Sequence, residues 1–157
     1  MTEKQFKYIE DLYKEEMVRD ESLSKKAQVY LSINSLLITA LVFKAKDLKE
    51  LLVQPSGLES LLVILTFIFI FISFLAIILA LAIYRYERPT DVQTLIDEQD
   101  KGIEDSDFIE NRASDFIVAF EKNSRIGDKK ANFLMIALIG LVLSFGSGII
   151  LMINLVL

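Results

Sequence analysis

LLVILTFIFIFISFLAIILALAI, residues 61–83, contains no charged side chain in 23 positions, and only Thr66 and Ser73 interrupt its apolar residues. A helix of about 20 apolar residues, rising 1.5 Å per residue, crosses the roughly 30 Å hydrocarbon layer of a bilayer. Residues 131–157 form a second uncharged run, 27 residues long. A chain of 157 residues is too short to bury both runs in a soluble core. The sequence therefore predicts an integral membrane protein.

A third uncharged run, residues 27–43, is 17 residues long and contains several polar side chains. This length is marginal for a span, and a buried helix of a soluble core is the alternative for this segment alone. We expect an all-α fold with three transmembrane helices, and two spans is the next count to consider.

Lysine and arginine predict the orientation. Six lie before the first run, three between the first and second, and eight between the second and third. Cytosolic segments next to spans are enriched in these residues, so we expect a cytosolic N-terminus. The predicted segments are a cytosolic amphipathic helix (1–26), transmembrane helix 1 (27–43), an external loop (44–60), transmembrane helix 2 (61–84), a cytosolic helical segment (85–130) and transmembrane helix 3 (131–157).

Local signals predict where the helices begin and end. Thr2-Glu3-Lys4-Gln5 has the spacing of a capping box, and no Gly or Pro occurs before Pro55. We therefore expect one helix from residue 3 to about 43. Residues 54–57 are expected to form a turn.

A second amphipathic helix is expected from Asp107, continuing through Gly127 into the last span. A hinge at Gly127 is the alternative. Between the second span and this helix, Tyr84-Arg85-Tyr86 is expected to anchor the interface. Residues 90–99 are expected to form a short helix that stops by Gly102.

One stripe of polar residues follows the first span. Gln28, Ser32, Ser35 and Thr39 are spaced by 4, 3 and 4 residues and so share a helix face. Such a pore or interface stripe would line a water path or pair across a subunit interface. Alternatively, the hydroxyl and amide groups bond neighbouring backbone or helices.

A stripe of small residues follows the third span. Gly140, Ser144 and Gly148 recur every four residues, and small residues let helix backbones approach closely. We predict helix packing on this face, with a partner helix in the same chain or in another.

Several classes of function are disfavoured. The chain has no cysteine, histidine or tryptophan, so the usual ligands of zinc and haem and the usual base for activating a hydroxyl are missing. No charged residue lies inside the three runs, which disfavours ion-coupled transport. The predicted cytosolic segments hold 14 basic and 19 acidic residues, which disfavours nucleic-acid polymers as partners. We expect no enzymatic activity, no metal site and no cofactor.

Basic residues gather next to the last span. Lys122, Arg125, Lys129 and Lys130 lie within nine positions. Contact with lipid headgroups is one interpretation of this cluster, and an anionic ligand is the other. Residues 24–28 (SKKAQ) and 128–132 (DKKAN) also match each other at an offset of 104. This match indicates either an internal repeat or simply paired lysines at a membrane boundary.

Three segments carry a family resemblance. They are Ser24-Lys25-Lys26-Ala27 with Leu31-Ser32-Ile33-Asn34-Ser35-Leu36-Leu37, then Glu87-Arg88-Pro89, and finally Asn123-Ser124-Arg125-Ile126-Gly127-Asp128-Lys129-Lys130-Ala131-Asn132. In these segments, in order and spacing over most of its length, the chain resembles the transmembrane effectors of the bacterial Pycsar antiphage systems. The resemblance implies a protein of the bacterial inner membrane that responds to a cyclic pyrimidine nucleotide made after phage infection. Such an effector damages the membrane and kills the cell, which is abortive infection.

The resulting hypothesis is a homo-oligomeric effector of antiviral defense, embedded in the lipid bilayer. Its cytosolic helices, about 3–26 and 107–130, would bind the nucleotide, with Arg112, Lys122, Arg125, Lys129 and Lys130 as candidates for phosphate contact. Two rivals remain: a constitutive membrane scaffold, and a channel subunit without nucleotide control.

Overall fold

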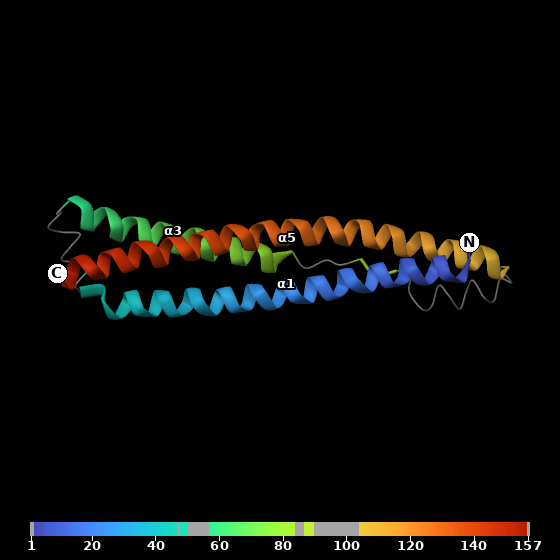
Figure 1. Cartoon of the computed structure of the whole chain (residues 1–157), viewed down its shortest axis with the longest axis horizontal. Coiled ribbons are helices and arrows are strands. Elements are labelled where there is room, and N and C mark those ends of the chain that lie inside the picture. Colours follow the sequence, from blue (N-terminus) through green and yellow to red (C-terminus); the bar gives the residue numbers. More distant parts are fainter. Residues whose placement is uncertain (1, 47, 50–56, 84–86, 90–103, 157) are drawn as a thin grey trace. The chain divides into compact units, whose positions relative to one another are not determined.

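Three long helices are the main elements of the computed structural model, which describes residues 2–46, 48–49, 57–83, 87–89 and 104–156 (Figure 1). They are α1 (Glu3–Phe43), α3 (Gly57–Ala82) and α5 (Asp105–Val156). Each is long and apolar enough to cross a membrane, and no strand occurs in these described ranges. The predicted all-α, three-span fold is therefore confirmed, and the chain is a multi-pass membrane protein.

Helix α1 begins at the predicted capping box. The Thr2 backbone N–H donates to Gln5 Oε1 at 2.9 Å, and the Gln5 backbone N–H points back to Thr2 Oγ1 at 3.4 Å. These bonds satisfy two backbone donors that the first turn leaves open. The helix ends at Phe43, as predicted, and the Lys44 N–H is shared between the carbonyls of Ala40 and Leu41, as is common at helix termini.

The other two helices begin a few residues earlier than the sequence predicted. Helix α3 begins at Gly57 rather than Leu61 and ends at Ala82. Helix α5 begins at Asp105 and continues through Gly127 without interruption. Of the expected turn at 54–57, only Gly57 is described, and it begins α3. The interface anchors 84–86, the short helix 90–99 and the stop at Gly102 lie outside the described residues.

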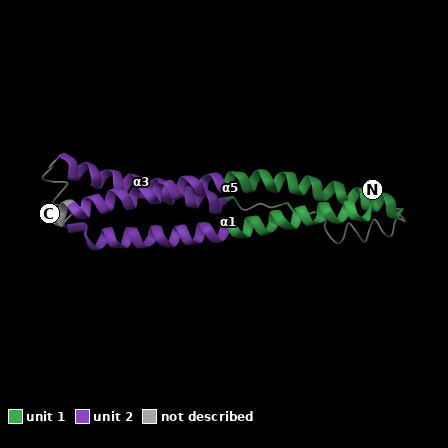
Figure 2. Ribbon diagram, in the orientation of Figure 1, with its two compact units in different colours: residues 1–23, 83–129 green, residues 24–82, 130–157 purple. Residues whose placement is uncertain are grey.

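The chain divides into two compact units, drawn in different colours in Figure 2. Unit 1 contains residues 1–23 and 83–129, and unit 2 contains residues 24–82 and 130–157. Helices α1 and α5 each contribute residues to both units without a break in the helix.

Unit 2 is packed as a membrane bundle is. Its outward positions carry large apolar side chains, such as Phe71 at 65% and Met135 at 63% exposure. Its buried positions are often small or weakly polar, such as Ala76 and Ser73. Lipid tails solvate apolar side chains as well as a protein core does, so helices in a bilayer associate through close backbone contact and hydrogen bonds instead.

Unit 1 is packed around an aromatic cluster. The Phe116 ring lies edge-on to the rings of Phe6 and Tyr13, with centroids 5.9 and 5.4 Å apart. Phe116 is 9% exposed. Phe6 and Tyr13 lie in the predicted amphipathic helix of residues 1–26, and Phe116 lies in the second predicted amphipathic helix. The two amphipathic faces therefore cover each other, as in a soluble helix pair.

Candidate functional site

The polar stripe of the first span lies on an exposed face of α1. Gln28, Ser32, Ser35 and Thr39 are all exposed, and we call this surface the hydroxyl face. Each hydroxyl bonds a carbonyl of its own helix: Ser32 to Gln28 O at 3.0 Å, Ser35 to Leu31 O at 2.9 Å and Thr39 to Ser35 O at 2.8 Å. This is the local back-bonding that hydroxyl residues make inside helices.

The bonds to its own helix determine which surroundings the hydroxyl face tolerates. Each Ser or Thr hydroxyl proton has a hydrogen-bond partner in its own helix. Placing the hydroxyl face against lipid therefore leaves no hydroxyl proton unpaired and costs little free energy. Each hydroxyl oxygen still keeps a lone pair that can accept a further hydrogen bond. The Gln28 side-chain amide has no partner within the described part of the chain. The face is therefore compatible with lipid and also suited to water or a second polar surface.

A buried polar chain crosses unit 2. Asn34 Nδ2 donates to Ser73 Oγ at 3.0 Å, and Ser73 Oγ donates to the Ala137 carbonyl at 3.0 Å. Asn34 and Ser73 are fully buried, and the chain of bonds joins α1, α3 and α5. Asn34 Oδ1 has no partner. A buried amide oxygen without a donor is destabilising by about 1–3 kcal/mol, so this contact is incompletely satisfied.

Helix α5 packs closely on α3 beside that chain. A Cβ added at Gly140 would lie 3.0 Å from both the Phe69 carbonyl oxygen and Ser73 Cβ. Thr66 and Ser147 form a further contact between these helices, with their hydroxyl oxygens 2.7 Å apart. Ser144 is buried and donates to the Leu141 carbonyl. At Gly140, the partner of the small-residue stripe is thus α3 of the same chain.

The small-residue stripe does not pack closely along its whole length. At Gly148 an added Cβ would meet no atom within 4 Å. The close approach of α3 and α5 is therefore concentrated at Gly140, and Gly148 has open space beside it.

In unit 1, the segment after the second span is held by a buried amide. Asn123 is fully buried. Its Oδ1 accepts from the Glu87 N–H at 2.9 Å, and its Nδ2 donates to the Glu87 carbonyl at 2.9 Å. Lys122 Nζ pairs with the Glu87 carboxylate at 2.8 Å, and the Tyr13 hydroxyl donates to the Glu87 carbonyl at 3.5 Å. One residue is thus fixed by side chains of both α1 and α5.

Arg19 of unit 1 forms an ion pair between α1 and α5. Arg19 binds Asp128 at 2.6 Å and Glu16 at 3.3 Å. The hydrogen bond from Asp128 raises the pKa of Arg19 above its usual value, and burial opposes this effect. Burial raises the pKa of Tyr13, and the charge of Arg88 partly offsets it.

The five candidates for phosphate contact are in different environments. Arg112 lies over the Phe116 ring at 5.4 Å from its centroid. Lys122 is engaged by Glu87. Lys130 belongs to unit 2, is 3% exposed and donates to Ser24 Oγ at 2.8 Å. Arg125 and Lys129 are exposed, and neither makes an ion pair with another described residue. These two are the members of the set that are open to a ligand.

The burial of Lys130 also bears on the apparent repeat. The matching position, Lys26, is exposed. The two KKA segments are both helical, but their second lysines have different surroundings within unit 2.

Sequence reasoning missed the residues that join the helices. Asn34, Glu87 and Asn123 each lie in one of the three segments that carry the family resemblance, and each makes a buried or interhelical contact. The available signal was Asn34 itself, an amide near the middle of an uncharged run. Comparison of the chain with protein-family models, with curated proteins and with solved structures finds no match.

Proposed function

We propose that this protein is a homo-oligomeric membrane effector of antiphage defence, which permeabilises the bacterial inner membrane when a cyclic pyrimidine nucleotide binds to unit 1. The observation that carries the proposal is the hydroxyl face of α1. Polar groups at the depth of the membrane favour contact with protein or water over lipid, and here four of them are exposed on one side of a span.

The resting state is a chain whose hydroxyl face lies against lipid, which the back-bonded hydroxyls tolerate. In the active state several copies turn this face toward a common axis, where the free lone pairs accept hydrogen bonds from water. No ionised group is needed inside the membrane for this change. The width of the water path would depend on the number of copies around the axis.

The trigger acts at Arg125 and Lys129. These residues are four apart on α5 and so lie on the same side of the helix, with Cβ atoms roughly 5–6 Å apart. A guanidinium and an ammonium at this spacing suit one phosphate group. With the N-terminus in the cytosol, as the lysine and arginine counts favour, this face of unit 1 is on the side where a nucleotide signal is made.

Coupling runs through α1 and α5, which belong to both units. A ligand shifts a conformational equilibrium only by its difference in affinity for the two states. The nucleotide must therefore bind the active arrangement of unit 1 more tightly than the resting one.

Dye release from liposomes tests the proposal. The purified full-length protein is reconstituted with and without cyclic CMP or cyclic UMP, and release is expected only when the nucleotide is present. Replacing Ser32 and Ser35 with Leu should abolish release but leave nucleotide binding unchanged. The control is Val29→Leu with Ala40→Leu, at exposed positions of α1 that do not continue the spacing of the hydroxyl face, and it should release dye as the native protein does.

A second pair of variants tests the trigger. Arg125→Gln with Lys129→Gln should weaken nucleotide binding by about tenfold or more, since a hydrogen bond to a charged group contributes roughly 1.5–3 kcal/mol. Lys25→Gln with Lys26→Gln removes the same charge from exposed positions of α1 and should bind normally. Release without any nucleotide would favour the channel subunit. If no nucleotide binds and no dye escapes, the scaffold is the better interpretation.

A further inference from the structure

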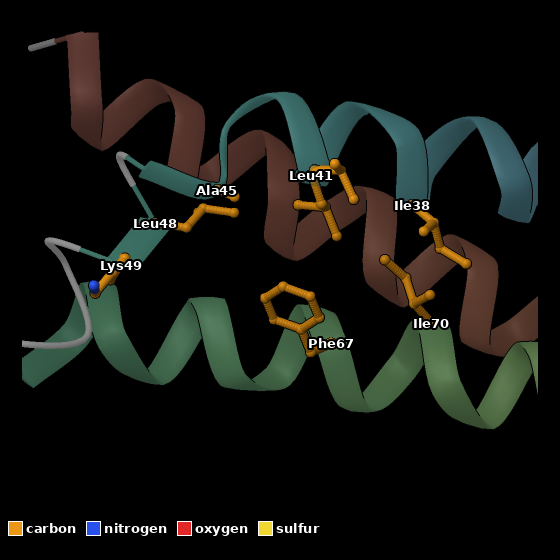
Figure 3. Close-up of a pocket in the computed structure, with 8 residues that line it drawn as sticks. Ile38, Leu41, Ala45, Leu48, Lys49, Phe67 and Ile70 are labelled. Carbon is orange, nitrogen blue, oxygen red and sulfur yellow. The ribbon is translucent and has the colours of Figure 1, made fainter.

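An apolar groove lies in unit 2 between α1 and α3. Helix α1 contributes Ile38, Leu41 and Val42, and α3 contributes Phe67 and Ile70. Figure 3 shows the Leu41 side chain directed toward the Phe67 ring across this space. The groove has a volume of about 240 Å³, and Val42 and Phe67 on its walls are 67% and 47% exposed. It is therefore open to the hydrocarbon of a bilayer.

A single charge marks one end of the groove. Lys49 is the only charged residue among the described residues that line it, and its ammonium lies at the end beyond Leu48 (Figure 3). Leu48 is buried against Leu62, Val63 and Leu151, which fixes the short helical segment that carries Lys49. An apolar channel with a cation at one end matches an amphiphile that has an anionic head and a hydrocarbon tail.

The groove has room for part of a lipid acyl chain but not for a helix. A volume of 240 Å³ holds roughly eight groups of the size of water, at about 30 Å³ each, and methylene groups are of similar size. From Ile38 to Val42, which line the groove on α1, the helix rises about 6 Å, less than half of one leaflet's hydrocarbon depth of about 15 Å. A helix of a second copy, about 10–12 Å across with its side chains, is too wide for this space.

We propose that this groove binds one acyl chain of an anionic phospholipid, with the headgroup phosphate paired to Lys49 Nζ. The lipid comes from the leaflet on the side of Lys49. The tail lies between α1 and α3 against Leu41, Phe67 and Ile70. This site needs neither nucleotide nor oligomer, so it stands or falls independently of the proposed function.

Fluorescence quenching by brominated lipid tests the site, because the chain has no tryptophan. Phe67→Trp reports from the groove. Phe71→Trp, one turn along α3 and 65% exposed, reports from ordinary lipid-facing surface. Each variant is reconstituted in phosphatidylcholine vesicles that contain either brominated phosphatidylglycerol or brominated phosphatidylcholine at equal mole fraction.

At Phe67→Trp, we expect association to favour phosphatidylglycerol by roughly fivefold, the ratio that corresponds to one lysine near an anionic surface. Adding Lys49→Gln should remove the preference, whereas Lys46→Gln, at an exposed position outside the groove, should keep it. At Phe71→Trp the two lipids should quench equally. Equal quenching at Phe67→Trp, or no quenching there by either lipid because protein covers the groove, would overturn the proposal.

Discussion

Replacing Gly140 with Ala tests the closest contact in unit 2. The added Cβ would lie 3.0 Å from the Phe69 carbonyl oxygen and from Ser73 Cβ, where ordinary contacts begin at 3.4 Å. Helix α3 or α5 must therefore move by several tenths of an ångström. The α3 backbone itself is an obstacle, since Ser73 N would also lie 3.2 Å from the added Cβ, so no side-chain rotation relieves the contact.

The magnitude follows from two opposing effects. Alanine favours a helix over glycine by about 0.5–1 kcal/mol, and this gain applies at any glycine of α5. Overpacking costs about 1–3 kcal/mol, and displacement also weakens the Ser73–Ala137 hydrogen bond, worth roughly 0.6 kcal/mol in a membrane protein. Gly146→Ala is the matched control, because nothing lies within 4 Å of its added Cβ. We expect Gly140→Ala to be less stable than Gly146→Ala by about 2–3 kcal/mol.

Equilibrium unfolding by SDS in mixed micelles measures this difference. The chain has no cysteine, so cysteines introduced at the exposed positions Leu58 and Ile153 can carry a dye pair that reports on the separation of α3 and α5. Gly148→Ala, which also has open space, should behave like Gly146→Ala. If all three variants unfold at the same SDS fraction, the close approach of α3 and α5 at Gly140 is wrong.

Three further predictions concern the polar contacts. Ser73→Ala should destabilise unit 2 by about 1–3 kcal/mol because it leaves the Asn34 amide without an acceptor. Asn34→Leu should lower the free energy of unfolding by less, because it also removes the unpartnered Asn34 Oδ1. The double variant should be no less stable than Ser73→Ala. Equal losses of stability for the two single variants in the same SDS assay would contradict this. Asn123→Ala should speed hydrogen exchange of the Glu87 amide at least tenfold by removing its acceptor, whereas Asn111→Ala, at an exposed position of α5, should leave it unchanged. Burial raises the pKa of Tyr13, so its ionisation should occur later than that of an ordinary tyrosine when absorbance at 295 nm is followed through alkaline pH. Tyr13→Phe should remove this late component, and Arg88→Gln should move it to still higher pH because the lowering charge is gone. The sign of the pKa shift means that Tyr13 contributes stability below its unfolded pKa of about 10, and this contribution is lost as pH rises through the folded pKa. A 295 nm titration that is the same for the native chain and Tyr13→Phe, apart from amplitude, would contradict the burial of Tyr13.

The sequence by itself determined the three helices. Insertion into a membrane depends on the length and apolarity of each segment, so the uncharged runs identify the spans without any knowledge of their partners. Helix starts are equally local, and the bonds between Thr2 and Gln5 follow from four consecutive residues. Since a single glycine is tolerated inside a helix at about 1 kcal/mol, the continuity of α5 through Gly127 could also be anticipated.

Only the tertiary structure decided which side chains meet, because burial depends on the helices that each face contacts. Lys130 follows Lys129 directly, yet Lys129 is exposed and Lys130 bonds Ser24. Asn34 and Ser35 are neighbours in one run, yet Asn34 is buried and bonds Ser73 of α3, whereas Ser35 faces outward. Adjacent residues of a helix point about 100° apart, and only the position of a neighbouring helix determines which of the two becomes part of the core.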